Sequence, residues 1–332
     1  MTTSSRERNR IRRDTVSMTV PTLNYVSCQE PSGSSHRMAY WLWGDANAPH
    51  VVVCVHGLSR QGRDFDALAR ALLERSPVPL RIACPDVVGR GRSDWLADPM
   101  QYGLPLYTGD MLQMLGQLHV QAPVQTLDWV GTSMGGLIGM AVCGSPKLPL
   151  PVPVRRLVLN DVGPVIQWSA LQRIGTYLGR AGSFDSVQHA ADAMWQVSKG
   201  FGPHTPQQWL ELSQAMVMPL AAGGFTLHYD PAIAVPFRAL SEPVAIAGQE
   251  TLWQLYDAIR ADTLLLRGAQ SDLLTRETAA EMQRRGPQAR LVEFDGVGHA
   301  PTLMAYDQVE AVAAFLGAPT LVPDEKPRSG TG

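Results

Sequence analysis

The chain has 332 residues, of which 45% are hydrophobic and 17% are charged, and its formal net charge is −2. Such a chain can bury a large core, and its near-neutral charge argues against a nucleic-acid partner. No apolar run reaches the ~18 residues that a membrane span requires, so we expect a soluble protein.

The two ends of the chain differ in composition from the rest. Residues 1–18 are rich in Arg, Ser and Thr but lack the apolar stretch of a secretory signal. We expect a disordered tail there, or translation that starts at Met18, with a transit peptide as an alternative. Residues 318–332 are rich in Pro, Gly and charge, and a second loose tail is expected there.

Strands and helices are expected to alternate in the first part of the chain. Apolar runs predict strands at residues 37–43, 51–55 and 80–84, and apolar residues at helical spacing predict helices at 65–74 and 106–118. This alternation predicts an α/β fold, a mostly parallel sheet with helices on both faces.

The most informative segment is Gly-Thr-Ser-Met-Gly at residues 131–135, which follows an apolar run and precedes a helix of small residues. A strand that turns sharply into a helix lifts one hydroxyl clear of the backbone, and it leaves no room for side chains at positions 131 and 135. We therefore expect Ser133 to have a strained backbone and to act as a nucleophile. A chance match of this short motif is the alternative, and the strand-turn-helix context argues against it.

A serine hydroxyl requires a histidine that accepts its proton. A strand is predicted at residues 291–294, and His299 follows it in the loop before the last helix. In such a fold the serine, the acid and the histidine follow one another along the chain, and the histidine lies after the last strand. His299 has this position and is therefore the predicted base.

The acid that orients His299 should follow a strand between the serine and the histidine. Asp272 lies just past the strand predicted at residues 263–268, and chain order favours it. Asp161, which follows the strand predicted at residues 154–159, is the alternative.

An oxyanion formed on the substrate would need backbone N–H donors. One should belong to Met134, the residue after the nucleophile, and the other to Leu58 in the loop after the strand at 51–55. His56 is expected to brace that loop.

Together these segments resemble the serine hydrolases of the α/β-hydrolase superfamily over about residues 37–317. The resemblance rests on His56-Gly57, the run PDVVGRGRSD at residues 85–94, GTSMGG at 131–136, Asp272, and Gly298-His299. It implies an eight-stranded sheet, a triad of Ser133, Asp272 and His299, and neither a cofactor nor a metal. It disfavours epoxide hydrolases and haloalkane dehalogenases. In those enzymes the same strand-to-helix turn, called the nucleophile elbow, carries Asp where this chain has Ser133.

Residues 163–248 interrupt the alternation and are rich in Trp, Met and Gly. Hydrolases of this family insert a helical cap at this place, and the apolar residues here have helical spacing. We therefore expect a cap at 163–248 and a hydrolase core made of residues 19–162 and 249–317.

The predicted function is the hydrolysis of a carboxylic ester of a small to medium, largely apolar or hydroxyacyl molecule, through an acyl-enzyme on Ser133. A carbon–carbon bond hydrolase of ring-fission diketones would use the same triad, and its carboxylate-bearing substrate would require an arginine such as Arg60, Arg63 or Arg238. A ligand receptor without catalytic activity is a further alternative.

The four cysteines form no Cys-x-x-Cys pair, so they indicate neither a disulfide framework nor a metal cluster. Small buried thiols in a reducing compartment are expected, which places the protein in the cytoplasm. The partner expected from the predicted function is a small-molecule substrate.

Overall fold

The computed structural model describes residues 20–30, 33–180 and 182–317. The tails expected at 1–18 and 318–332 lie outside the described residues. No helix in the described ranges is both long enough and apolar enough to cross a membrane.

A mixed sheet of eight strands forms the centre of the molecule, in the order β1-β2-β4-β3-β5-β6-β9-β10. The strands are β1 Thr22–Gln29, β2 Ser35–Gly44, β3 His50–Val55, β4 Arg81–Asp86, β5 Thr126–Thr132, β6 Val154–Asn160, β9 Asp262–Gly268 and β10 Arg290–Phe294. Strand β2 pairs antiparallel with both β1 and β4, and all other neighbours are parallel. The predicted α/β fold with a mostly parallel sheet is confirmed, although the pattern had not indicated β1.

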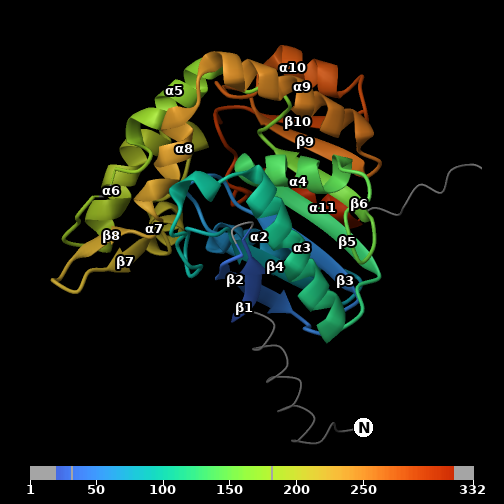
Figure 1. Ribbon diagram of the computed structural model, residues 1–332, viewed down its shortest axis with the longest axis horizontal. Coiled ribbons are helices and arrows are strands. Elements are labelled where there is room, and N and C mark those ends of the chain that lie inside the picture. Colours follow the sequence, from blue (N-terminus) through green and yellow to red (C-terminus); the bar gives the residue numbers. More distant parts are fainter. Residues whose placement is uncertain (1–19, 31–32, 181, 318–332) are drawn as a thin grey trace, which may run out of the picture.

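Helices cover both faces of this sheet (Figure 1). The core helices are α2 Asp66–Arg75, α3 Leu104–Gln121, α4 Met134–Gly144, α9 Glu242–Ala258, α10 Arg276–Met282 and α11 Tyr306–Gly317. In β3, Val51, Val53 and Val55 pack on the face of α3 and α4, whereas Val52 and Cys54 pack on the face of α2. Because both faces are covered, this strand is a continuous apolar run.

An insert, residues 163–241, lies between β6 and α9 and forms a group of its own beside the sheet (Figure 1). It holds α5 Trp168–Tyr177, α6 Val187–Ser198, α7 Pro206–Gln214, α8 Ala234–Ala239 and a hairpin of β7 Val217–Pro219 and β8 Phe225–Leu227. Strands of three residues are too short to show a period, which explains why the pattern predicted only helices. The expected boundary at residue 248 falls inside α9, which packs on the core helix α4. Four 3-10 turns complete the described elements, at Gly62–Phe65, Pro99–Gln101, Lys199–Phe201 and Pro231–Ile233.

The insert is tied to the loop that follows β4. The N–H of Gly91 donates to the carbonyl of His228 at 2.9 Å, and the N–H of Asp230 donates to the carbonyl of Gly89 at 2.7 Å. The Tyr102 hydroxyl donates to the Asp230 carboxylate at 2.6 Å. These bonds hold the insert beside the core loops that surround Ser133.

Candidate active site

Ser133 occupies the turn between β5 and α4, with φ 51° and ψ −115°. This is a strained conformation for a residue with a side chain. A Cβ at Gly131 would collide with the carbonyl of Gly135, and a Cβ at Gly135 would collide with the carbonyl of Val55. The strain at Ser133 and the need for both glycines are therefore as the sequence predicted.

His299 connects Ser133 to a carboxylate. Its Nε2 lies 2.9 Å from the Oγ of Ser133, and its Nδ1 lies 2.8 Å from an Oδ of Asp161. The serine and the carboxylate therefore engage different nitrogens of one imidazole. In such an array the carboxylate keeps the proton on Nδ1, and Nε2 is left free to accept the serine proton.

Asp161 is fully buried and lies immediately after β6. Its N–H donates to the carbonyl of Leu266 on β9 at 2.8 Å. One carboxylate oxygen accepts from the N–H of Gly268 at 2.9 Å, and the other, which faces His299, also accepts from the Ser271 hydroxyl at 2.6 Å. Three donors thus hold the carboxylate in place.

The expectation that Asp272 orients His299 is wrong, and the alternative, Asp161, lies at this place instead. In the turn after β9 the hydroxyl of Ser271 points inward to Asp161, whereas the side chain of Asp272 is 47% exposed. Asp272 accepts two hydrogen bonds from the guanidinium of Arg173 on α5, at 2.6 and 2.9 Å. It therefore joins the core to the insert.

Leu58 and Met134, whose N–H groups are the predicted oxyanion donors, line one pocket together with Ser133. In the described part of the chain, neither N–H has a hydrogen-bond partner. Met134 begins α4, so its N–H also lies at the positive end of a helix dipole. Such free donors can stabilise negative charge on a substrate oxygen.

Arg90 braces both of these residues, a role that the sequence did not indicate. This fully buried side chain donates from Nε to the carbonyl of Leu58 at 2.8 Å, and its guanidinium lies 3.7 Å from the sulfur of Met134. It also donates to the Tyr107 hydroxyl at 3.1 Å. The run of glycines and arginines after β4 is the feature of the sequence that could have indicated the role of Arg90.

His56 braces the same loop, as predicted. Its Nδ1 lies 2.7 Å from the Gly57 carbonyl, and its Nε2 accepts the N–H of Val87 at 2.9 Å. The pKa of His56 is lowered to about 3, mainly by its complete burial; the bond to Gly57 opposes this shift, and the charges of Arg90 and Arg60 add to it. The imidazole is therefore neutral at physiological pH and fixes the loop without adding charge.

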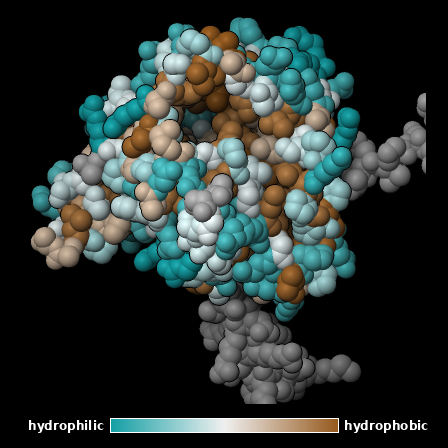
Figure 2. Space-filling view, in the orientation of Figure 1, coloured by the Kyte–Doolittle hydropathy of each residue, from teal (hydrophilic) through white to brown (hydrophobic). Residues whose placement is uncertain are grey.

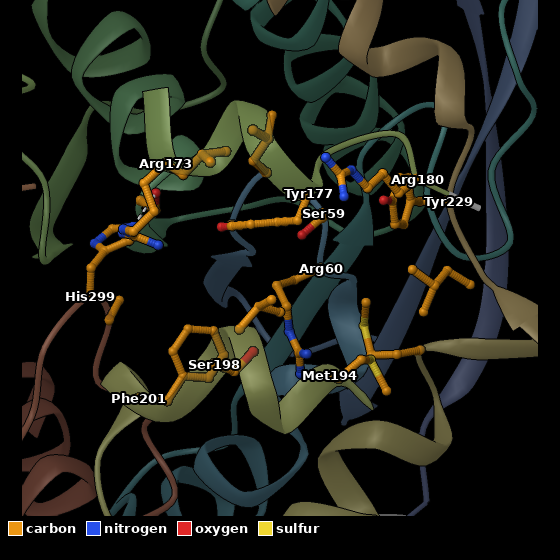
Figure 3. A pocket seen from close by; sticks show the side chains of 18 of the residues that line it. Ser59, Arg60, Arg173, Tyr177, Arg180, Met194, Ser198, Phe201, Tyr229 and His299 are labelled. Carbon is orange, nitrogen blue, oxygen red and sulfur yellow. Dashed lines mark hydrogen bonds between the residues drawn. The ribbon is translucent and has the colours of Figure 1, made fainter. Parts of the chain in front are cut away.

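Two cavities meet at Ser133. The first, which we call the His299 cavity, has a volume of about 430 Å³ and is bordered by Ser133, His299 and side chains of α5 and α6 (Figure 3). The second, the Met134 cavity, has a volume of about 470 Å³ and is bordered by Ser133, Met134 and apolar side chains of α3, α5, α8 and α9. Figure 2 shows a hollow with hydrophobic walls in the region of α5, α8 and α9.

Of the three arginines considered for a substrate carboxylate, only Arg60 borders either of the two cavities at Ser133, namely the His299 cavity. Arg63 pairs with Asp66 at the start of α2, and Arg238 donates to the carbonyl of Leu178. Arg173 and Arg180 also line the His299 cavity, and sequence reasoning missed both. No periodic pattern marks which side of a short insert helix faces a cavity.

One group of possible metal ligands occurs among the described residues, namely Cys28, His36 and Asp110, and none of them borders either cavity. His36 lies between two carboxylates, 3.0 Å from Asp110 and 3.5 Å from Glu30. Burial lowers the pKa of His36, but the bonds and charges of Asp110 and Glu30 outweigh it and leave the pKa raised. A raised pKa favours the protonated imidazole, which does not ligate a metal. The pairing of His36 with Asp110 and Glu30 is therefore the better explanation of this group.

Comparisons with known proteins agree with this geometry. Residues 52–315 match the model of the alpha/beta hydrolase family. A 3-hydroxybutyrate-oligomer hydrolase of Cupriavidus necator is 47% identical over 299 residues, which cover 89% of this chain and 98% of that protein. The sn-1-specific diacylglycerol lipase ABHD11 of Mus musculus is 26% identical over 294 residues, with 83% of each chain covered. Among solved structures, an alpha/beta hydrolase of Novosphingobium aromaticivorans is similar with a TM-score of 0.74 and 32% identity, over 89% of this chain and 98% of that one.

Proposed function

The chain belongs to the alpha/beta hydrolase family and is an ester hydrolase, and we propose that it hydrolyses short oligomers of 3-hydroxybutyrate through an acyl-enzyme on Ser133. The observation that carries the catalytic part is the hydrogen-bonded series of Ser133, His299 and Asp161 at the meeting point of two cavities. The relative from Cupriavidus necator, which this chain covers almost completely, supports the substrate class.

In the first half of the proposed reaction, the Oγ of Ser133 attacks the ester carbon while Nε2 of His299 takes the serine proton. The carbonyl oxygen becomes an oxyanion that accepts hydrogen bonds from the N–H groups of Leu58 and Met134. The bond from carbon to the alcohol oxygen then breaks, and His299 gives its proton to that oxygen. An acylated Ser133 and a free alcohol result.

In the second half, water attacks the acyl carbon and gives a proton to Nε2 of His299. The bond between the carbon and Oγ of Ser133 breaks, and the proton passes from His299 to Oγ. The products are a carboxylic acid and the original enzyme. Asp161 stabilises the imidazolium in both halves and keeps its own charge.

The reducing compartment expected from the cysteines belongs to the same proposal. All four cysteines, Cys28, Cys54, Cys84 and Cys143, carry free thiols, and three of them are fully buried. Cys54 and Cys84 lie on the neighbouring strands β3 and β4 and are not bonded to each other. Unbonded neighbouring thiols support a role in the cytoplasm.

The carbon–carbon bond hydrolase stays as the second candidate, because arginines line the His299 cavity as a carboxylate-bearing diketone would require. The hydrogen-bonded series of three residues argues against a receptor without catalytic activity.

The test is the hydrolysis of a 3-hydroxybutyrate dimer, p-nitrophenyl butyrate and a ring-fission diketone by the purified protein. We expect turnover of both esters, and its loss in Ser133→Ala. Ser198→Ala, which alters another serine that lines the His299 cavity, is the matched control and should retain activity. Turnover of the diketone alone would replace the ester proposal, and ester hydrolysis that survives in Ser133→Ala would refute the acyl-enzyme.

A further inference from the structure

The two cavities that meet at Ser133 differ in charge. Three arginines, Arg60, Arg173 and Arg180, and no acidic residue line the His299 cavity. The residues that line the Met134 cavity include no charged side chain. The two parts of a bound ester therefore lie in unlike surroundings.

The position of His299 decides which cavity receives which part of the ester. The alcohol oxygen must lie within reach of Nε2 of His299, because that nitrogen supplies its proton. His299 borders the arginine-lined cavity and does not border the apolar one. Of the two oxyanion residues, Met134 borders only the apolar cavity and Leu58 borders both. The leaving alcohol thus lies in the His299 cavity, and the acyl part lies in the Met134 cavity.

Two of the three arginines are neutralised by neighbouring carboxylates. Arg60 donates two hydrogen bonds to Asp64, both at 2.7 Å, and Arg173 is paired with Asp272. Arg180 has no ion pair within the described residues. It is therefore the arginine of this cavity whose positive charge is free to bind an anion.

Arg180 lies across the cavity from His299. Figure 3 shows His299 at one end, Arg180 with Tyr229 at the other end, and Tyr177 and Ser59 between them. Tyr177 and Ser59 bring hydroxyl groups to the same wall. An alcohol fragment that starts at His299 and ends in an anion would span this cavity.

We propose that Arg180 is the binding site for the free carboxylate of the leaving fragment, so that this enzyme selects hydroxy-acid oligomers by their carboxylate end. The inference rests on the proposed function. In a chain of 3-hydroxy acids, the alcohol side of every ester bond leads to the carboxylate terminus, and the acyl side leads to the hydroxyl terminus. The charge of each cavity therefore suits the part of the oligomer that the position of His299 assigns to it.

The orientation makes the two ends of a substrate unequal. Esterification of the carboxylate removes the charged partner of Arg180, whereas acetylation of the terminal hydroxyl changes no charge and adds an acetyl group in an uncharged cavity. Hydrogen bonds between charged groups are the stronger ones, so the first change should matter more.

The experiment compares three forms of the 3-hydroxybutyrate dimer: the free acid, its methyl ester and the free acid acetylated at the hydroxyl end. We expect the free acid to have a kcat/KM at least tenfold above that of the methyl ester, and acetylation to change kcat/KM by less than threefold. In Arg180→Gln, the loss on the free acid should exceed the loss on p-nitrophenyl butyrate by tenfold, mainly through KM, and Arg180→Lys should recover part of it.

Arg260→Gln removes the same charge from an exposed position that borders neither cavity. It should leave kcat/KM unchanged for the three forms of the dimer and for p-nitrophenyl butyrate. Equal rates on the free acid and the methyl ester, or a preference that survives in Arg180→Gln, would overturn the carboxylate site and leave the ester proposal intact. Hydrolysis of p-nitrophenyl butyrate with no hydrolysis of any dimer would overturn both.

Discussion

Asp161→Asn is the substitution that most directly tests how the site works. The carboxylate of Asp161 accepts hydrogen bonds from Gly268, Ser271 and His299. Asparagine has nearly the same shape, and its oxygen can still accept the N–H of Gly268. Its NH₂ group would then face Nδ1 of His299 and donate to it. Nδ1 becomes an acceptor, and the proton moves to Nε2.

The wrong tautomer determines the size of the effect. With a proton on Nε2, His299 can no longer accept the proton of Ser133, 2.9 Å away. The equivalent change in a serine protease lowers kcat about 10⁴-fold, which corresponds to roughly 5 kcal/mol of activation free energy. We expect a fall in kcat of about 10³- to 10⁴-fold for Asp161→Asn, with KM changed little.

Asp272→Asn is the matched control, because it makes the same chemical change in the acid that chain order favours. Asp272 belongs to a half-exposed pair with Arg173, and such pairs contribute about 0–1 kcal/mol. Because the pair contributes so little energy, we expect the kcat of Asp272→Asn to stay within about threefold of the wild-type value. The assay is the hydrolysis of p-nitrophenyl butyrate, with circular dichroism to check folding. A folded Asp161→Asn protein that keeps more than a tenth of the activity, or an Asp272→Asn protein that loses it, would refute the reasoning.

Two further predictions concern His56 and Arg90, which brace the loop after β3 that carries Leu58. The pKa of His56 is about 3 in the folded protein and 6.5 in the unfolded chain, so acid favours the unfolded state. The contribution of His56 to stability is fully present above pH 6.5, and through this residue the free energy of unfolding should fall by about 2 kcal/mol between pH 7 and pH 5. Urea unfolding of the wild type and His56→Gln at both pH values measures this, and equal losses in the two proteins would contradict it. Arg90→Lys should lower kcat by about tenfold to a hundredfold with little change in KM, since the carbonyl of Leu58 and the sulfur of Met134 lose their contacts with the guanidinium. Steady-state kinetics decide this, and a change in KM alone would show that Arg90 does not position the donors.

Local backbone geometry explains why the elbow was predictable. The tight turn at Ser133 tolerates no side chain at Gly131 or Gly135. The residues that this turn requires are therefore close together in the sequence and can be recognised there. The apolar runs of the central strands are equally local, because a strand covered on both faces must be apolar throughout. The loop before the last helix, which carries His299, followed from the order of these elements.

Such local patterns could not identify the acid that orients His299. Asp161 and Asp272 each follow one of two parallel strands, β6 and β9, which are neighbours in the sheet. Their carboxyl ends therefore meet at one edge, and both residues are candidates by chain order. The path of the turn after β9 decides between them, because it points Ser271 inward and leaves Asp272 exposed.

The sequence by itself thus determined the sheet, the strained serine and the histidine, because each depends on the chemistry of a few adjacent residues. Only the tertiary structure decided the identity of the acid, the bracing by Arg90 and the exposure of Arg180 to the His299 cavity. Each of these depends on how segments distant in the chain approach one another, and the packing of the whole fold sets that approach.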